Sequence, residues 1–223
     1  MTDSLRVILE IGKKKRIVAG AMDWPGLDRW GTTEDGAIET LLSYRPRYAG
    51  VAERAGLTKE FAQAGDPVVV ERVPGVGSTD FWGIAHAPSE IEREVLSKAD
   101  LDRRLDLLSA CWAYFDDVAG RVSPELRLGP RGGGRTRDQI IGHVYRVEPG
   151  QFSGKVEVRT PIDVGVPAAE VAAFREEFLA AIRTYNAEGK PARTWPIQFL
   201  IRRVAHHAMD HAWEMEDRDL SPS

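Results

Sequence analysis

Two hydrophobic periodicities divide the chain. From residue 93 onward, apolar residues recur every three or four positions, as expected for amphipathic helices. The pattern predicts helices over residues 97–120, from Thr136 to about 147, from about 171 to Gly189, and from about 195 to 218. Four such helices joined by loops predict a four-helix bundle over residues 93–218.

The first part of the chain carries shorter, strand-like runs. LRVILEIG (5–12), RIVAGAMDW (16–24) and PVVVERV (67–73) are apolar and rich in β-branched residues. A lysine-rich tip at 12–15 predicts a hairpin between the first two runs. Thr32 or Thr33 can cap a helix that follows, which Pro46 should kink or end.

The predicted order is therefore β-β-α-β over residues 1–88. The connecting segment, PGVGSTDFWGIAHAPSEIE (74–92), is rich in proline, glycine and serine and predicts a boundary before the bundle. The whole chain is predicted to be of the α+β class. Phe81 and Trp82 in this segment are predicted to seal the interface between the two parts.

Bulk properties narrow the classes of partner. The chain has 223 residues and a formal net charge of −4, so bulk electrostatics do not favour a nucleic-acid partner. No apolar run has the length of a membrane span, and the N-terminus lacks the order of a secretory signal. The single cysteine, Cys111, permits no internal disulfide and lies at an apolar helical phase beside Trp112. These features favour a cytoplasmic protein without a membrane or nucleic-acid partner, with Cys111 packed in the core.

The sharpest chemical signal is the histidine content of the last predicted helix. His207 and His211 stand four residues apart on its apolar stripe, where a bundle normally places leucine. His143 occupies an equivalent inward phase on the second bundle helix. Buried imidazoles need partners, and a metal ion satisfies that need. We therefore predict a divalent metal site at His143, His207 and His211, with zinc, nickel or ferrous iron as the suitable ions.

Other residues of the same region are less strongly indicated as parts of the metal site. His206 is rotated by about 100° from the stripe and is expected to face another surface. The acids Asp210, Glu214 and Glu148 are candidates for orienting the histidines or for a general base. Core histidines satisfied by hydrogen bonds alone are the competing interpretation of the cluster. The zinc-protease motif is absent, because no glutamate follows the first histidine of the pair.

A glycine-rich stretch, RGGGR (131–135), precedes the second bundle helix. It lacks the lysine and serine or threonine of a phosphate-binding loop and has no preceding strand. We interpret it as a connection between helices.

The motifs GHV (142–144) and HAMDH (207–211) resemble the DinB-like superfamily of metal-binding four-helix bundles. The resemblance covers residues 93–218 and implies that His143, His207 and His211 hold the metal. It also implies thiol-dependent S-transferase or isomerase chemistry with a low-molecular-weight thiol. The family pair is often followed by arginine and glycine, whereas this chain has Ala212-Trp213-Glu214, which puts transfer of that thiol chemistry in doubt.

The N-terminal part resembles a HicB-like domain in its strand–strand–helix–strand order and in DWPGLDRWGTTEDGAIETLLSY (23–44). HicB-like domains occur in toxin–antitoxin systems with a DNA-binding segment. No helix-turn-helix or ribbon arm is evident in the sequence, which argues against an antitoxin role.

Two functions from different classes follow. The first is a metal-dependent enzyme, a transferase or hydrolase acting on a small molecule. The second is a non-catalytic protein- or ligand-binding module, suggested by the aromatic junction of Trp24, Trp30, Phe81 and Trp82. Homodimerisation through the bundle helices is left open by the sequence.

Overall fold

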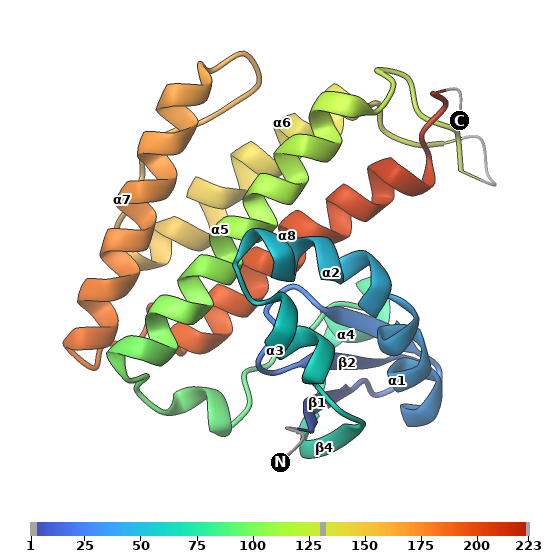
Figure 1. The fold of residues 1–223 in the computed structure, drawn as a ribbon, viewed down its shortest axis with the longest axis vertical. Helices are drawn as coiled ribbons and strands as arrows, with labels where there is room; N and C mark the ends of the chain where they lie inside the picture. Colours follow the sequence, from blue (N-terminus) through green and yellow to red (C-terminus); the bar gives the residue numbers. More distant parts are fainter. Residues whose placement is uncertain (1–3, 130–132, 222–223) are drawn as a thin grey trace.

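The computed structural model describes residues 4–129 and 133–221, and within them it combines one mixed sheet with eight α-helices. The α+β class is therefore confirmed. The sheet and its covering helices form one end of the molecule, and four longer helices form the other (Figure 1). The strands are β1 (Leu5–Ile11), β2 (Ile17–Ala21), β3 (Asp28–Gly31) and β4 (Pro67–Pro74). The helices beside the sheet are α1 (Glu34–Ser43), α2 (Arg45–Arg54), α3 (Thr58–Gln63) and α4 (Gly77–Trp82).

The sheet has the order β3-β2-β1-β4. β1 pairs antiparallel with β2, as the predicted hairpin requires, and parallel with β4 after the crossover through α1–α3. Side chains alternate between its faces, so Val7 and Leu9 pack toward the hydrophobic core while Ile8 and Glu10 point to the opposite face.

The β-β-α-β prediction omitted β3, which pairs antiparallel with β2. This strand has only four residues, and two of them, Asp28 and Arg29, are buried and charged. Residues 28–31 therefore lack the alternation of apolar and polar residues by which a strand is recognised in a sequence. Each of the two side chains forms an ion pair, Asp28 with Arg202 and Arg29 with Asp210, and the Arg29 guanidinium also stacks on the Tyr44 and Trp213 rings.

The helical signals after β3 are confirmed in detail. Thr33 is the N-cap of α1 and accepts a hydrogen bond from the backbone of Gly36. Pro46 lies in the first turn of a new helix, α2, so the long predicted helix is two short ones.

The four long helices begin close to the predicted positions. Ser97 caps one of them and Thr136 another, the latter through a capping box with Gln139. The helices are α5 (Lys98–Arg121), α6 (Arg137–Val147), α7 (Ala168–Ala187) and α8 (Ile197–Asp217). A π-turn (Glu148–Phe152) and a 3-10 turn (Ser153–Val156) continue α6.

Helix α8 is the centre of the molecule. It packs against α5, α6 and α7 and also against the segment around Ile91–Arg93, so almost every face of it is buried. One hydrophobic cluster runs from Leu5 of the sheet through Trp112 of α5 to Met215 of α8. The two sequence units at 1–88 and 93–218 therefore share one core, and their division at 88–93 stays a prediction.

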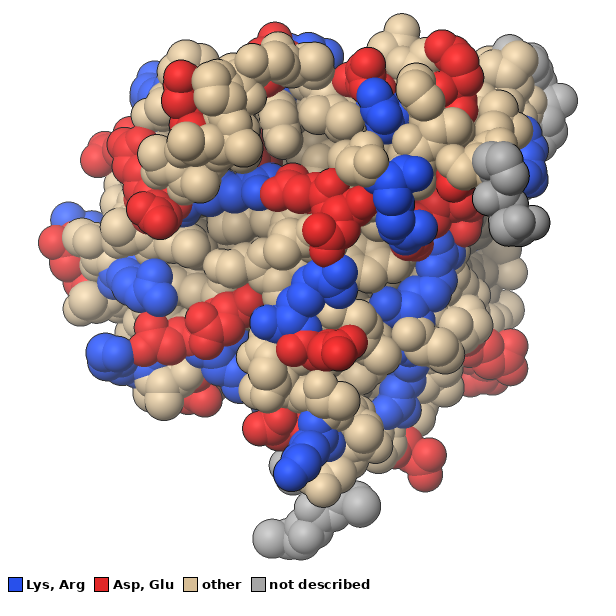
Figure 2. Space-filling model, turned by 45° about the horizontal axis from the view of Figure 1, so that its top comes forward, with Lys and Arg blue, Asp and Glu red and all other residues tan. Residues whose placement is uncertain are grey.

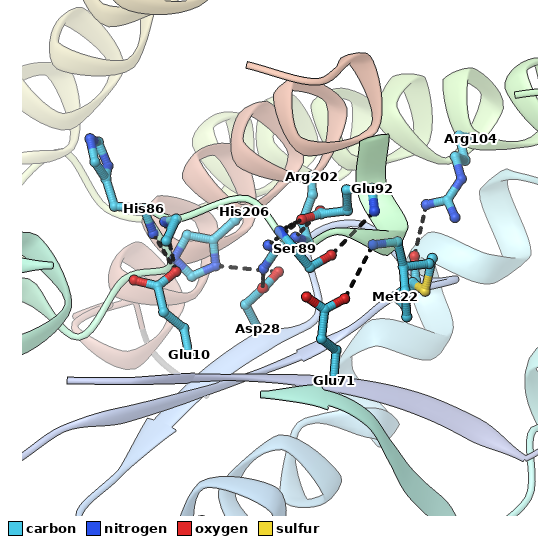
Figure 3. Close-up of polar contacts among 12 residues, drawn as sticks. Glu10, Met22, Asp28, Glu71, His86, Ser89, Glu92, Arg104, Arg202 and His206 are labelled. Atoms are coloured by element: carbon cyan, nitrogen blue, oxygen red, sulfur yellow. Dashed lines mark hydrogen bonds and ion pairs between the residues drawn. The ribbon is translucent and has the colours of Figure 1, made fainter. Parts of the chain in front are cut away.

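A buried ion network joins α8 to the sheet. Arg202 lies between Asp28 of β3 and Glu92 of the connecting segment, with Nη1–Oδ1 and Nε–Oε1 distances of 3.0 and 2.7 Å (Figure 3). All three side chains are at least 96% buried. Gly20 makes room for the network, because a Cβ there would overlap the Asp28 carboxylate.

The surface carries both signs of charge. Figure 2 shows Lys and Arg interspersed with Asp and Glu over the viewed face. Among the described residues, ion pairs such as Arg175–Asp116 join charges of opposite sign. None of the helices in the described part of the chain combines the length and apolarity that a bilayer crossing requires.

Arg202→Met should destabilise the fold by about 3–5 kcal/mol, because it leaves the buried carboxylates of Asp28 and Glu92 without their cation. Urea denaturation followed by circular dichroism measures this change. The matched control is Arg183→Met, which removes an exposed arginine paired with Asp102 and should leave the midpoint almost unchanged. Equal midpoints for the two variants would contradict the assigned role of Arg202.

Candidate functional site

The structure brings His143, His207 and His211 together between α6 and α8. One ring nitrogen from each lies within 4.8 Å of those from the other two. The Nε2 atoms of His143 and His207 are 3.3 Å apart, and the three ring centroids are separated by 4.7–5.2 Å. Residues more than sixty positions apart in the chain therefore form one cluster.

Helical geometry explains this convergence. His207 and His211 are one turn apart on α8 and present their rings to the same side. His143 lies near the middle of α6, whose inward residues Ile140 and Val144 are buried in the common core. The apolar stripe of α6 thus aims the His143 ring at the pair on α8.

Glu214 orients His211. Its Oε2 lies 2.8 Å from His211 Nδ1, which leaves Nε2 of that ring for another partner. Arg135 and Arg218 hold the Glu214 carboxylate at 2.7 and 3.0 Å. Burial opposes ionisation of Glu214, but the His211 hydrogen bond and the two arginines outweigh it and lower its pKa to about 2. Glu214 is therefore a carboxylate at neutral pH.

Burial keeps the other two rings neutral. It lowers the pKa of His143 to about 4, with His211 and Arg135 adding to the effect. Burial also holds the pKa of His207 well below its usual range. Neutral imidazoles are the form in which histidine binds metals. Nδ1 of His207 is buried and has no hydrogen-bond partner among the described residues.

The histidines line a cavity of about 560 Å³ between α6, α8 and the end of α4. Its apolar walls include Trp82, Ile84, Val147 and Phe152, and the Phe152 ring packs edge-on against His207 at 5.5 Å. Small-molecule sites commonly have a volume of about 300–1,000 Å³, but this cavity is lined by more polar and charged side chains than is usual for them.

One pair of donors can be compared with the edge of a metal site. A tetrahedral ion with metal–nitrogen bonds of about 2.0–2.1 Å has nitrogen–nitrogen edges of about 3.3–3.4 Å. The 3.3 Å separation of His143 and His207 Nε2 matches such an edge. A long hydrogen bond between two neutral rings has a similar nitrogen–nitrogen separation.

His206 lies on a different side of α8, as predicted, but that side is buried rather than a free surface. Its Nδ1 is 3.8 Å from Asp28 Oδ2 of the sheet (Figure 3). The physical reason is that α8 meets Asp28 of the sheet on one side and packs against helices on the other.

The three candidate acids have different hydrogen-bonding partners. Glu214 contacts His211, whereas Asp210 forms an ion pair with Arg29 at 3.0 Å. Glu148 is buried behind the cavity and accepts a hydrogen bond of 2.6 Å from Trp112 Nε1. Of the three, Glu214 alone hydrogen-bonds one of the clustered histidines in the described part of the structure.

Two side chains of this site escaped the sequence reasoning. Arg135 ends the glycine-rich stretch, of which residues 131–132 lie outside the described residues, and it pairs with Glu214. Arg203 lines the cavity from α8 and is 5% exposed. Its position four residues before His207, on the same stripe, was a usable signal.

The other predictions have mixed outcomes. Cys111 is fully buried, and burial raises the pKa of its thiol, so the core assignment is confirmed. The prediction that Phe81 and Trp82 seal an interface is wrong, since they are 68% and 63% exposed. Asp80 beside them instead accepts hydrogen bonds from the backbone of Lys13, Lys14 and Lys15 at the hairpin tip.

Comparisons with family models, with curated proteins and with solved structures found no match to the chain. Function is therefore inferred from the site's own residues.

Glu148 should make stability depend on pH. Burial raises its pKa to about 7, above the value of an unfolded chain, so the folded state binds more protons between pH 4.5 and 7. Stability should fall as pH rises through this window, by at most about 3 kcal/mol. Glu148→Gln keeps an acceptor for Trp112 and should remove this part of the slope.

Urea midpoints at pH 5 and pH 8 measure the effect. The variant should match the wild type near pH 5 and exceed it at pH 8. Parallel profiles of wild type and variant over this range would show that Glu148 is ionised at no cost in the fold.

Proposed function

We propose that the chain is a divalent-metal-binding protein of the DinB-like type, in which His143, His207 and His211 hold the ion. The observation that carries the proposal is the convergence of three ring nitrogens within 4.8 Å at the wall of a small-molecule-sized cavity. Two of the three rings are kept neutral by burial, and imidazole donors suit zinc, nickel or ferrous iron.

The surroundings of the site support an enzyme acting on a small molecule, as a transferase or hydrolase. A bound divalent ion would supply Lewis-acid activation and lower the pKa of a water or thiol that coordinates it. Glu214 fixes the orientation of His211, while Phe152 and Val147 form part of the apolar wall beside the histidines. The cavity of about 560 Å³ has room for a low-molecular-weight thiol, and our proposal includes such a thiol as co-substrate.

The N-terminal part is proposed to be a HicB-like unit that supports the site. Its sheet covers one side of α8 through Asp28, and its α4 contributes Trp82 to the cavity wall. A cytoplasmic location, homodimerisation and the absence of a nucleic-acid partner stay predictions from the sequence.

A non-catalytic binding module is the second candidate, and one observation favours it. Phe81 and Trp82 are mostly exposed and pack edge-on against each other with centroids 4.4 Å apart. Exposed aromatic pairs are common in ligand- and protein-binding surfaces. A ligand whose affinity depends on Phe81 and is unaffected by loss of His207 would favour this module.

Protein purified without a histidine tag should contain close to one divalent ion per chain, as measured by plasma mass spectrometry. His207→Ala should abolish the metal, because it removes a central donor of the cluster. His86→Ala is the matched control, since His86 lies outside the cluster. Absence of bound or bindable Zn²⁺, Ni²⁺ and Fe²⁺ in the wild type would refute the metal centre.

Glu214→Gln should weaken metal affinity by about 10–100-fold, because the neutral amide supports the His211 imidazole less well than a carboxylate does. Competition with a chelating indicator gives this affinity. An unchanged value would mean that Glu214 serves only its ion pairs with Arg135 and Arg218.

A further inference from the structure

The most unusual group in the histidine cavity is Arg203. It is 5% exposed and lines the cavity one helical turn before His207. Its Nε and Nη1 atoms are fully buried and have no hydrogen-bond partner among the described residues. Buried arginines are normally paired, so an unpaired one at the wall of a cavity requires an explanation.

The neighbouring acids are already engaged elsewhere. Asp28 bonds Arg202 at 3.0 Å, and Asp210 bonds Arg29 at the same distance. The Glu10 carboxylate accepts hydrogen bonds from Thr79 and from the backbone of His86 and Ala87. Asp28 Oδ2 also lacks a hydrogen-bond partner among the described residues, but no carboxylate of the described structure hydrogen-bonds Arg203.

Arg203 nevertheless keeps its charge. Burial lowers its pKa to about 10, which is still far above neutral pH. The nearby acids, including Asp28 and Asp210, lessen that decrease without hydrogen-bonding the guanidinium. Arg203 thus places a fixed positive charge at the cavity wall, and two of its buried donors have no partner among the described residues.

The shape of the group indicates what would satisfy it. A guanidinium is a planar fork of donors that matches the oxygens of a carboxylate or a phosphate. The cavity of about 560 Å³ accommodates a small molecule rather than a macromolecular segment. An anion there would share the cavity with His143, His207 and His211.

We propose that Arg203 binds the oxyanion group, carboxylate or phosphate, of the small molecule on which the histidine site acts. The substrate would then be an anion held at one point by the arginine and presented to the histidines at another. That the bound anion is a substrate rests on the proposed function. The anion site itself can be tested in protein without metal.

The test uses the 223-residue chain, stripped of metal by a chelator and then dialysed. Isothermal titration with succinate, inorganic phosphate and neutral succinamide distinguishes a carboxylate from a phosphate site. Succinate or phosphate should bind saturably, and succinamide should not. Arg203→Met should lower the affinity for the anion by about tenfold or more, because a charged hydrogen-bonding partner is lost.

Arg183→Met is the matched control, since it removes an exposed arginine on α7, and it should bind like the wild type. Arg203→Met should also raise the melting temperature of the ligand-free protein, because it removes an unpaired buried charge. A purely structural arginine would give the opposite shift. If Arg203→Met fails to fold, Arg203→Gln removes the charge while keeping polar atoms.

Equal anion affinity in wild type and charge-removed variants, or no saturable binding in the wild type, would overturn the proposal. His207→Ala separates it from the metal centre. Loss of metal with retained anion binding in that variant is expected. Anion binding that depends on Arg203 in a protein that binds no metal would refute the proposed function and leave the anion site standing.

Discussion

The position of α8 depends on one buried arginine. Arg202 is enclosed by Asp28 of the sheet and Glu92 of the connecting segment, and each carboxylate meets it at hydrogen-bonding distance. Unlike apolar contacts, such a pair tolerates little sliding or rotation, because a shift would leave buried charges unpaired. The helix that carries most of the histidine cluster is therefore fixed in both register and rotation about its axis.

That rotation decides what each polar residue of α8 contacts. Arg202 and His206 face the sheet, whereas His207 and His211 face α6 and meet His143. Neighbouring residues differ by about 100° around a helix, so turning α8 by about that angle would exchange their surroundings. The ion network on one side and the histidine cluster on the other are thus two consequences of the same packing.

The polar residues around the cavity are satisfied to different degrees. Glu214 is held by Arg135, Arg218 and His211, so its orientation is strongly determined. Arg203 lies on the same helix, and two of its buried donors have no partner within residues 4–129 and 133–221. Proteins commonly keep unpaired polar groups at functional sites. Such groups lower the stability of the ligand-free protein, and a bound ligand then supplies their hydrogen-bonding partner. This contrast separates groups that support the site from a group that awaits a ligand.

The sequence by itself determined the α+β class, the four long helices and the inward phase of the three histidines, because helical periodicity and capping residues are local signals. It missed β3, whose buried side chains are charged, and it misplaced the exposed Phe81 and Trp82. Only the tertiary structure decided that His143 reaches the α8 pair, that Glu214 rather than Asp210 supports it, and that Arg203 stays unpaired. These facts depend on how distant elements pack together, and residue spacing along one helix cannot specify that.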